Sequence, residues 1–263
     1  MRHDPANPVA PAGAPLLAIG GIAHSFGGFS VLRDVSIGVG AGRIVGLLGP
    51  NGSGKTTLFN IISGFLTPGA GSLSFDGREI TRLDVQARSR LGITRTFQTP
   101  KVFESLSTRD NVALGFYKQT GAGVVESLIG SARSRREMAD IRERSSALMT
   151  RFNLAALADA PAALLTAGQR RNLEIARALA GAPKLLMLDE PSTGLTRDEA
   201  DALGQALKSL GNDAVTVFVV SHDMEFMRIV DVAHVLYFGE IIASGDMRTV
   251  QADPKVRQIY LGT

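Results

Sequence analysis

One short segment, residues 49–57, constrains the fold of this chain more than any other feature. It reads Gly-Pro-Asn-Gly-Ser-Gly-Lys-Thr-Thr, follows the apolar run 43–48, and precedes a helical pattern that begins near Lys55. The segment fits the phosphate-binding pattern G-x-x-x-x-G-K-[ST], and a chance match in such a chain is roughly one in a hundred. A buried strand, a glycine-rich turn and a helix in this order predict an α/β core with a phosphate loop.

Each residue type in this segment suits contact with phosphate. Backbone N–H groups can converge on phosphate oxygens, helped by the helix N-terminus, and the glycines at 52 and 54 permit close approach. Lys55 would neutralise the β- and γ-phosphates, Thr56 would hold Mg²⁺, and Thr57 could donate to the α-phosphate. The alternative is a glycine-rich turn beside a surface lysine. The expected nucleotide-binding residues are Gly49, Pro50, Asn51, Gly52, Ser53, Gly54, Lys55, Thr56 and Thr57.

Two further apolar runs end in polar residues. Residues 184–188 lead into Asp189 and Glu190, and residues 215–220 lead into Ser221-His222-Asp223. Three such strands predict a parallel sheet with a ligand site along its carboxyl edge. Asp189 suits a metal and Glu190 suits a general base that polarises an attacking water. By itself, a strand that ends in Asp-Glu is also compatible with a helix cap.

Composition narrows the class of protein. The chain has 263 residues, 44% of them hydrophobic and 20% charged, which is typical of a folded domain. It has no cysteine, so disulfides, thiolate zinc sites and cysteine nucleophiles are excluded, and a net charge of +3 gives little reason to expect nucleic-acid binding. Residues 1–15, rich in Pro and Ala, predict a disordered leader and no export signal.

The remaining patterns are weaker. Residues 17–22, 31–39 and 73–75 predict strands, punctuated by glycine-containing turns at 27–28 and 76–77. The stretch 119–154 contains Gly121 and Gly123 and then a helical segment with interleaved Arg and Glu, which favours a solvated helix over a binding tract.

The order of these motifs resembles the ATP-binding subunits of ABC transporters, and the resemblance covers residues 16–263. It implies a P-loop NTPase core with an N-terminal antiparallel β portion and an inserted helical subdomain at about 100–165. Within that family the chain is most similar to the ATPases of branched-chain amino-acid importers. The elements that carry the family resemblance are Phe26, 49–57, Gln98, 165–169, 185–190, 191–196 and His222. Those that carry the subgroup resemblance are 95–98, 111–112, 173–179, 222–224 and 260–262.

The resemblance implies roles for residues whose sequence context alone says little. Gln98 would reach Mg²⁺ and the attacking water, His222 would contact the γ-phosphate and Glu190, and Phe26 would stack on adenine. The signature residues Thr166, Gly168 and Gln169 would close the nucleotide site of a second subunit. The alternatives are a core position for Phe26, a surface amide for Gln98 and a helix cap for His222. The implied catalytic residues are Glu190, His222 and Gln98, and the implied metal ligands are Thr56, Gln98 and Asp189.

The implied function is ATP hydrolysis by the energy-coupling subunit of an importer, with ATP and Mg²⁺ as cofactors and branched-chain or other amino acids as cargo. Urea or short amides are alternative cargoes, and a soluble ABC ATPase outside transport is a further alternative. The implied partners are transmembrane permease subunits, a second ATPase subunit in a homo- or heterodimer, and indirectly a solute-binding protein, with no nucleic acid. The implied location is the cytoplasmic face of the inner membrane, as a peripheral protein.

Three segments depart from the family pattern. In the signature, Thr166 replaces the usual Ser and keeps a hydroxyl group for the γ-phosphate, and Ala167 stands where Gly or Tyr is usual, which suits the turn only if its φ is negative. Thr196 replaces the usual Asn or Asp, which leaves contacts through that loop less certain. Ser221 stands where the subgroup often has Glu. None of these departures removes a metal ligand or the base, so we expect activity to survive.

Overall fold

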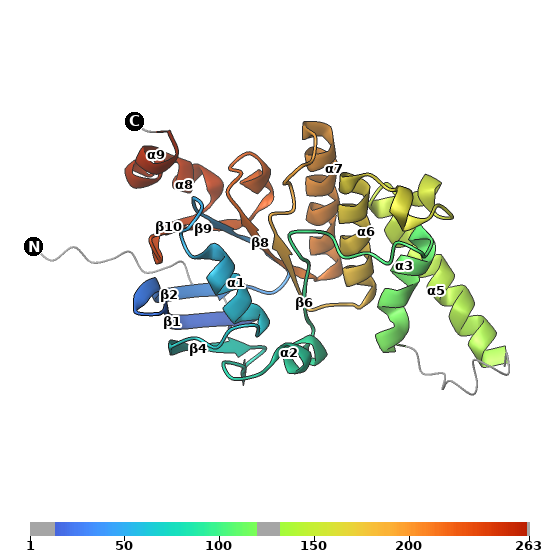
Figure 1. Cartoon of the computed structure of the whole chain (residues 1–263), viewed down its shortest axis with the longest axis horizontal. Helices are drawn as coiled ribbons and strands as arrows, with labels where there is room; N and C mark the ends of the chain where they lie inside the picture. The colour runs from blue at the N-terminus through green and yellow to red at the C-terminus, as the bar shows by residue number, and fades with distance from the viewer. Residues whose placement is uncertain (1–13, 120–131, 262–263) are drawn as a thin grey trace, which may run out of the picture. The chain divides into compact units, whose positions relative to one another are not determined.

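The computed structural model describes residues 14–119 and 132–261 and divides into two compact units (Figure 1). The first unit runs up to Arg95 and adds Lys184–Ser192 and the chain from Leu207 onward. The second comprises Thr96–Pro183 and Thr193–Ala206, and the helical subdomain expected at about 100–165 falls within its range. Most of the expected leader, together with Gly121, Gly123 and Gly262, lies outside the described residues.

A six-stranded sheet in the first unit has the order β10-β9-β3-β8-β7-β6. β3 pairs in parallel with β8 and β9, and β7 pairs in parallel with β8 and β6, while β10 is antiparallel to β9. The predicted parallel sheet is confirmed, and the carboxyl ends of β3, β7 and β8 share one edge. The strands are β3 (Ile44–Leu48), β6 (Ile93–Arg95), β7 (Leu185–Asp189), β8 (Thr216–Ser221), β9 (Val232–Tyr237) and β10 (Glu240–Gly245).

A second sheet, antiparallel and four-stranded, has the order β2-β1-β4-β5. The strands are β1 (Leu17–Phe26), β2 (Phe29–Val39), β4 (Ala70–Phe75) and β5 (Arg78–Glu79). Gly27 and Gly28 join β1 to β2 with φ values of +53° and +87°, the type of two-residue turn that a twisted hairpin requires. β1 therefore continues to the turn, four residues beyond the predicted end at residue 22.

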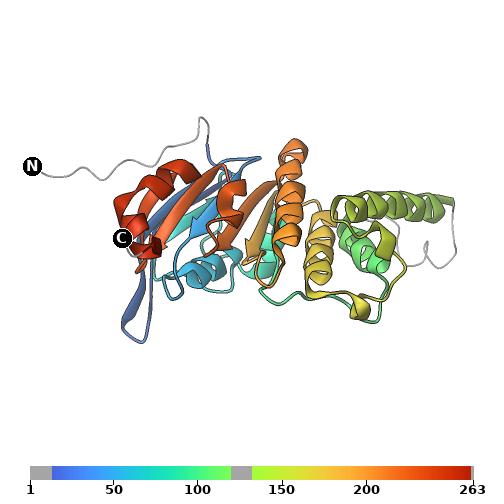
Figure 2. The same cartoon turned by 90° about the horizontal axis from the view of Figure 1, so that it is seen from above.

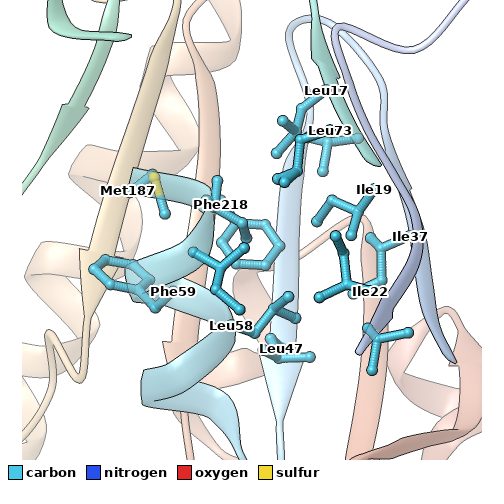
Figure 3. Packing of buried hydrophobic residues seen from close by; sticks show 14 of the residues in the cluster. Leu17, Ile19, Ile22, Ile37, Leu47, Leu58, Phe59, Leu73, Met187 and Phe218 are labelled. Carbon is cyan, nitrogen blue, oxygen red and sulfur yellow. The ribbon is translucent and has the colours of Figure 1, made fainter. Parts of the chain in front are cut away.

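Helix α1 (Lys55–Ser63) contributes its apolar side chains to the main hydrophobic cluster of this unit. Figure 3 shows Leu58 and Phe59 of α1 in the same cluster as Phe218 of β8 and Ile22 of β1. Burying these side chains from both sheets and the helix fixes the position of the helix that follows the phosphate loop. The unit also contains α2 (Val85–Leu91), α8 (Met247–Ala252) and α9 (Pro254–Leu261).

The second unit is helical. Helices α3 (Thr108–Gly115), α5 (Ala132–Arg151) and α6 (Ala167–Ala180) pack on one another and are drawn green to yellow in Figure 2. The charged stretch forms α5, and the exposed side chains at 135–136 and 138–140 confirm the predicted solvated helix. Helix α7 (Arg197–Lys208) lies mostly in this unit. The short 3₁₀ helices of this unit are η1 (Phe116–Gln119), η2 (Ala155–Leu157) and η3 (Ala162–Leu164), while η4 (Ser209–Asp213) and η5 (Phe226–Ile229) belong to the first unit.

Over the described ranges, no helix combines the length and the apolar character that a membrane span requires.

Candidate functional site

The phosphate loop connects the end of β3 to the start of α1, as the sequence predicts. Gly54 is the N-cap of α1 and has a φ of +107°, which favours glycine. A Cβ on Gly54 would lie 2.8 Å from Cδ2 of Leu32, and a Cβ on Gly49 would overlap the carbonyl oxygen of Leu236. Gly52 has open space around it and a φ of +79°. Glycine is thus required by packing at 49, by backbone conformation at 52, and by both at 54.

The side chains of the loop differ in accessibility. Asn51 and Thr56 are exposed, Pro50 and Thr57 are half-buried, and Ser53 is buried. The hydroxyl groups of Thr56 and Thr57 therefore stand at the start of α1, where a helix N-terminus favours an anion.

The side chain of Lys55 points back toward the start of the phosphate loop. Its Nζ donates to the carbonyl oxygens of Gly49 at 2.7 Å and Pro50 at 3.0 Å. Burial lowers the pKa of Lys55, and the nearby carboxylates of Glu190 and Asp189 act in the opposite direction. The ammonium group lies at the base of the loop, where phosphate oxygens would be strong charge-assisted acceptors.

Asp189 and Glu190 lie at the carboxyl end of β7, which is separated from β3 by β8 in the sheet. Asp189 is the last residue of β7 and is buried, while Glu190 comes just after the strand, its N–H donating to the carbonyl oxygen of Val220 at 2.8 Å. The φ of Glu190 is +48°, a left-handed conformation that is uncommon for non-glycine residues and is often found at functional sites.

Glu190 is held by the residues that follow β8. Its Oε2 accepts a hydrogen bond from Oγ of Ser221 at 3.2 Å and lies 2.9 Å from Nδ1 of His222. In the loop after β8, Oδ1 of Asp223 accepts from the N–H groups of Glu225 and Phe226. His222 is a partner of Glu190, and the helix-cap alternative is wrong, because the N-cap residue of the next helix, η5, is Glu225.

Arg95 is a second cation near Asp189, and sequence reasoning gave it no role beyond the subgroup motif. Its Nη1 donates to Oδ1 of Asn60 at 2.8 Å and to Oγ of Ser63 at 2.9 Å. The guanidinium also lies over the rings of Phe59 and Phe65, at 4.7 and 4.6 Å. Burial lowers the pKa of Arg95 and the carboxylate of Asp189 opposes this. Arg95 thus fixes the far end of α1 and adds positive potential near the carboxylates.

Phe26 ends β1 beside the glycine turn. Half of its surface is exposed (49%), and its ring meets that of His24 edge to face at 4.7 Å. The alternative of a core position for Phe26 is wrong, because the hairpin extends past the packed part of the sheet. An exposed ring is free to stack on a planar base.

The signature segment begins α6. Thr166 is the N-cap: its Oγ1 accepts from the N–H of Gln169 at 3.2 Å, and Oε1 of Gln169 accepts from the N–H of Thr166 at 3.0 Å. Ala167 is the first helical residue, so its φ is negative and the substitution costs no strain. A Cβ on Gly168 would lie 2.8 Å from Oε1 of Glu199, so a side chain at this position would require the Glu199 carboxylate to move.

The segment around Gln98 is clamped by α6. The Arg171 guanidinium donates to the carbonyl oxygens of Phe97 and Gln98, and Oε1 of Glu174 accepts from the N–H of Lys101 at 3.0 Å. Burial raises the pKa of Glu174, and these backbone and arginine contacts oppose the rise. The Gln98 side chain itself is exposed. Its backbone is held while its amide remains accessible.

The predicted site residues fall into two groups. The phosphate loop, Asp189, Glu190, His222 and Phe26 belong to the first unit, and Gln98 and the signature residues belong to the second. Sequence reasoning missed the α6 clamp on the Gln98 segment and the bond from Ser221 to Glu190. The repeated charges of α6 at 171, 174 and 177, spaced at i and i+3, were the available signal for the clamp.

A P-loop nucleoside triphosphatase is the class that this arrangement defines, because the carboxylates lie near the lysine of the phosphate loop and the histidine pairs with one of them. The chain belongs to the ABC transporter family: the model described as ABC transporter matches residues 32–193. A second model, described as branched-chain amino acid ATP-binding cassette transporter, matches residues 240–263. The chain is an ABC-type ATPase.

Similar proteins span the same length. The branched-chain amino acid transport ATP-binding protein LivG of Salmonella typhimurium is 34% identical over 250 residues, which are 94% of this chain and 98% of that protein. A lipopolysaccharide export ATP-binding protein, LptB of Acidithiobacillus ferridurans, is 36% identical over 88% of this chain and 90% of its own. A crystal structure of an ATP-binding cassette of an ABC transporter in its ADP conformation has a TM-score of 0.79, with 32% identity over 94% of this chain and 99% of that one.

Proposed function

We propose that this ATPase is the energy-coupling subunit of an importer for branched-chain amino acids. The observation that carries the cargo assignment is the family match over 240–263, which lies outside the ATPase motifs. Percent identity does not support the assignment of the cargo, because a lipopolysaccharide export protein is as similar to this chain as the amino-acid transport proteins are.

In the proposed reaction, Glu190 takes a proton from the water that attacks the γ-phosphate. Its Oε2 is occupied by Ser221 and His222, which orients the carboxylate and leaves Oε1 for the water. A His222 ring that carries protons on both nitrogens would donate from Nδ1 to Glu190 and from Nε2 to a γ-phosphate oxygen. Lys55 would move from the loop carbonyls to the phosphate oxygens, and Phe26 would stack on the adenine.

The residues near the loop fit Mg²⁺. Thr56 supplies a hydroxyl group and Asp189 a carboxylate, and Mg²⁺ bound to nucleotides takes few protein ligands and keeps several waters. Within the part of the chain that the structure describes, no group of three or more His, Cys, Asp or Glu side chains could cage a metal by itself, which agrees with a metal shared with phosphate. The ion would offset the charge of the β- and γ-phosphates, and Gln98 would add an amide oxygen.

Hydrolysis is proposed to require two subunits. Thr166 uses a lone pair of its hydroxyl oxygen to accept the Gln169 N–H, so its own proton is still available for a phosphate oxygen. Gly168 and Gln169 stand at the same helix N-terminus, which favours an anion. These residues would close the nucleotide site of the partner ATPase subunit, identical or related.

The proposed permease contact is the segment after Gln98. Phe103 is 54% exposed, although Asn111 holds its backbone at both the N–H and the carbonyl oxygen, each at 2.9 Å. Arg177 lies over its ring at 5.3 Å. A fixed backbone that presents an exposed aromatic ring suits an anchor for a short helix of a membrane subunit. Such an anchor would hold the chain at the cytoplasmic face of the membrane, and a solute-binding protein would contact the permease and not the ATPase.

The proposal is tested by affinity purification from native membranes with mass spectrometry, combined with uptake of labelled leucine and urea. Phe103→Asp should lose the permease subunits and leucine uptake while it still binds ATP. The matched control is Met138→Asp, since Met138 is 57% exposed on α5 of the same unit. Normal leucine uptake with Phe103→Asp would contradict the docking site, and urea uptake alone would contradict the cargo.

A further inference from the structure

Thr196, at the end of the loop that follows Glu190, makes contacts that its residue type alone does not predict. It comes directly before α7 and belongs to the second unit, as the signature residues do. The N–H of Thr196 donates to Oε2 of Glu199 at 2.9 Å, and its Oγ1 donates to the same oxygen at 3.1 Å. The N–H of Glu199 donates back to Oγ1 of Thr196 at 3.3 Å. This reciprocal pair is a capping box, so threonine at 196 ends the loop with a fixed geometry.

Glu199 also contacts the signature. A Cβ placed on Gly168 would lie 2.8 Å from Oε1 and 3.1 Å from Cδ of Glu199, and 3.1 Å from Cδ2 of Leu195. The side chains of Glu199 and Leu195 therefore pack against the Cα atom of Gly168. Gly168 is the second residue of α6, directly after Ala167 and the capping residue Thr166. The end of the loop 193–196 and the start of α7 thus lie against the start of α6.

The two oxygens of the Glu199 carboxylate have different partners. Oε2 is held by Thr196, and Oε1 is the oxygen nearest to Gly168. The carboxylate cannot turn away from Gly168 without breaking the cap of α7. One side chain therefore joins the loop 193–196 to the signature, and a displacement of either segment is passed to the other.

We propose that Glu199 is a positioning residue for closure of the ATPase dimer, because it holds the loop 193–196 and the signature of one subunit together as a single surface that meets the nucleotide of the partner. The inference rests on the proposed two-subunit reaction and is independent of the cargo. The role requires a side chain of this length with an oxygen acceptor, and it does not require negative charge. Glutamine should therefore replace Glu199, and alanine should not.

The test uses the full chain in the Glu190→Gln background, in which MgATP should hold the dimer without turnover. Sedimentation velocity with MgATP gives the dissociation constant of the dimer after addition of Glu199→Ala, Glu199→Gln or Asp198→Ala. Asp198→Ala is the matched control, because Asp198 is an exposed carboxylate in the same first turn of α7. Glu199→Ala should raise the dissociation constant about tenfold, since each of two subunits loses a cap and the contact with Gly168. The other two variants should stay within about twofold.

The same measurements can overturn the proposal. Equal dissociation constants for Glu199→Ala and Asp198→Ala would show that the contact has no role in closure. A Glu199→Gln dimer as weak as the Glu199→Ala dimer would assign the effect to charge and not to position. A joint fall in dimerisation, Tm and affinity for a fluorescent ATP analogue in Glu199→Ala would make the residue purely structural.

The background variant separates this inference from the proposed function. If Glu190→Gln alone does not dimerise with MgATP, the two-subunit reaction is wrong and the role of Glu199 falls with it. A normal dimer that is insensitive to Glu199→Ala would overturn the role of Glu199 alone.

Gly168→Ala provides an independent measure of the contact. Its Cβ requires the Glu199 carboxylate to move, so Gly168→Ala should weaken the dimer less in the Glu199→Ala background than with Glu199 present. Equal losses in the two backgrounds would contradict a direct contact between these residues.

Discussion

His234 makes the stability of the nucleotide-binding unit depend on pH. It is buried in β9, its Nδ1 lies 2.8 Å from Oγ of Ser244, and its Nε2 has no hydrogen-bond partner among the described residues. Burial lowers the pKa of His234 from 6.5 to about 4. The folded chain therefore keeps this ring neutral at pH values where the unfolded chain protonates it.

The difference between the folded and unfolded pKa of His234 sets how the free energy of unfolding changes with pH. A folded pKa below the unfolded value means that stability is fully present above pH 6.5 and is lost as the pH falls toward 4. At pH 5 the loss is about 2 kcal/mol, and it approaches about 3.4 kcal/mol at lower pH. Because His234 pairs with Leu47 in the β9–β3 ladder, this loss affects the strand that leads into the phosphate loop.

The measurement is urea unfolding followed by circular dichroism at pH 7.5 and pH 5.0. Other groups also titrate over this range, so the test is a difference: His234→Gln should lose about 2 kcal/mol less than the wild type on acidification. Parallel losses in the wild type and in His234→Gln would refute the reasoning.

Three further outcomes are expected. Glu190→Gln should bind ATP normally and accumulate as an ATP-bound dimer, with turnover reduced about 10²-fold or more in a phosphate-release assay. Thr166→Val should lose both the cap and the phosphate donor, giving at least a tenfold weaker ATP-driven dimerisation by light scattering, whereas Thr166→Ser should be close to neutral. Arg88→Met should lower the free energy of unfolding by about 3 kcal/mol or more, because the buried guanidinium donates to two carbonyl oxygens at the end of α1. Arg90→Met, on the exposed side of the same helix, should change it by less than about 0.5 kcal/mol.

The sequence predicts best those parts of the fold that are formed by a single contiguous segment. The phosphate loop, the apolar strands of the parallel sheet and the glycine turn at 27–28 are such segments, because each encodes its own backbone conformation. The position of the β1 end was missed, since strand length depends on where the partner strand stops.

The contacts of the site are harder to predict, because they join residues far apart in the chain. Ser221 was predicted at the carboxyl edge of the sheet and was noted as a departure from the family pattern, but its partner was not predicted: its hydroxyl group donates to Glu190, 31 residues away. Arg171 reaches the carbonyl oxygen of Phe97 across 74 residues. Such pairs are set by the register of packed elements, and no local pattern in the sequence encodes that register.

Helix α6 connects the Gln98 segment to the signature. Besides the contacts of Arg171 and Glu174, Arg177 near the end of the helix donates to the carbonyl oxygen of Lys101, and Thr166 caps the other end, eleven residues earlier and thus about 16 Å away along the axis. A straight helix turned by about 5° at the clamped end moves its first turn by about 1.4 Å. That displacement is larger than the whole range of distances over which a hydroxyl group can hydrogen-bond a phosphate oxygen. A small tilt transmitted from the exposed ring of Phe103 would therefore suffice to bring the signature into register with a nucleotide or take it out.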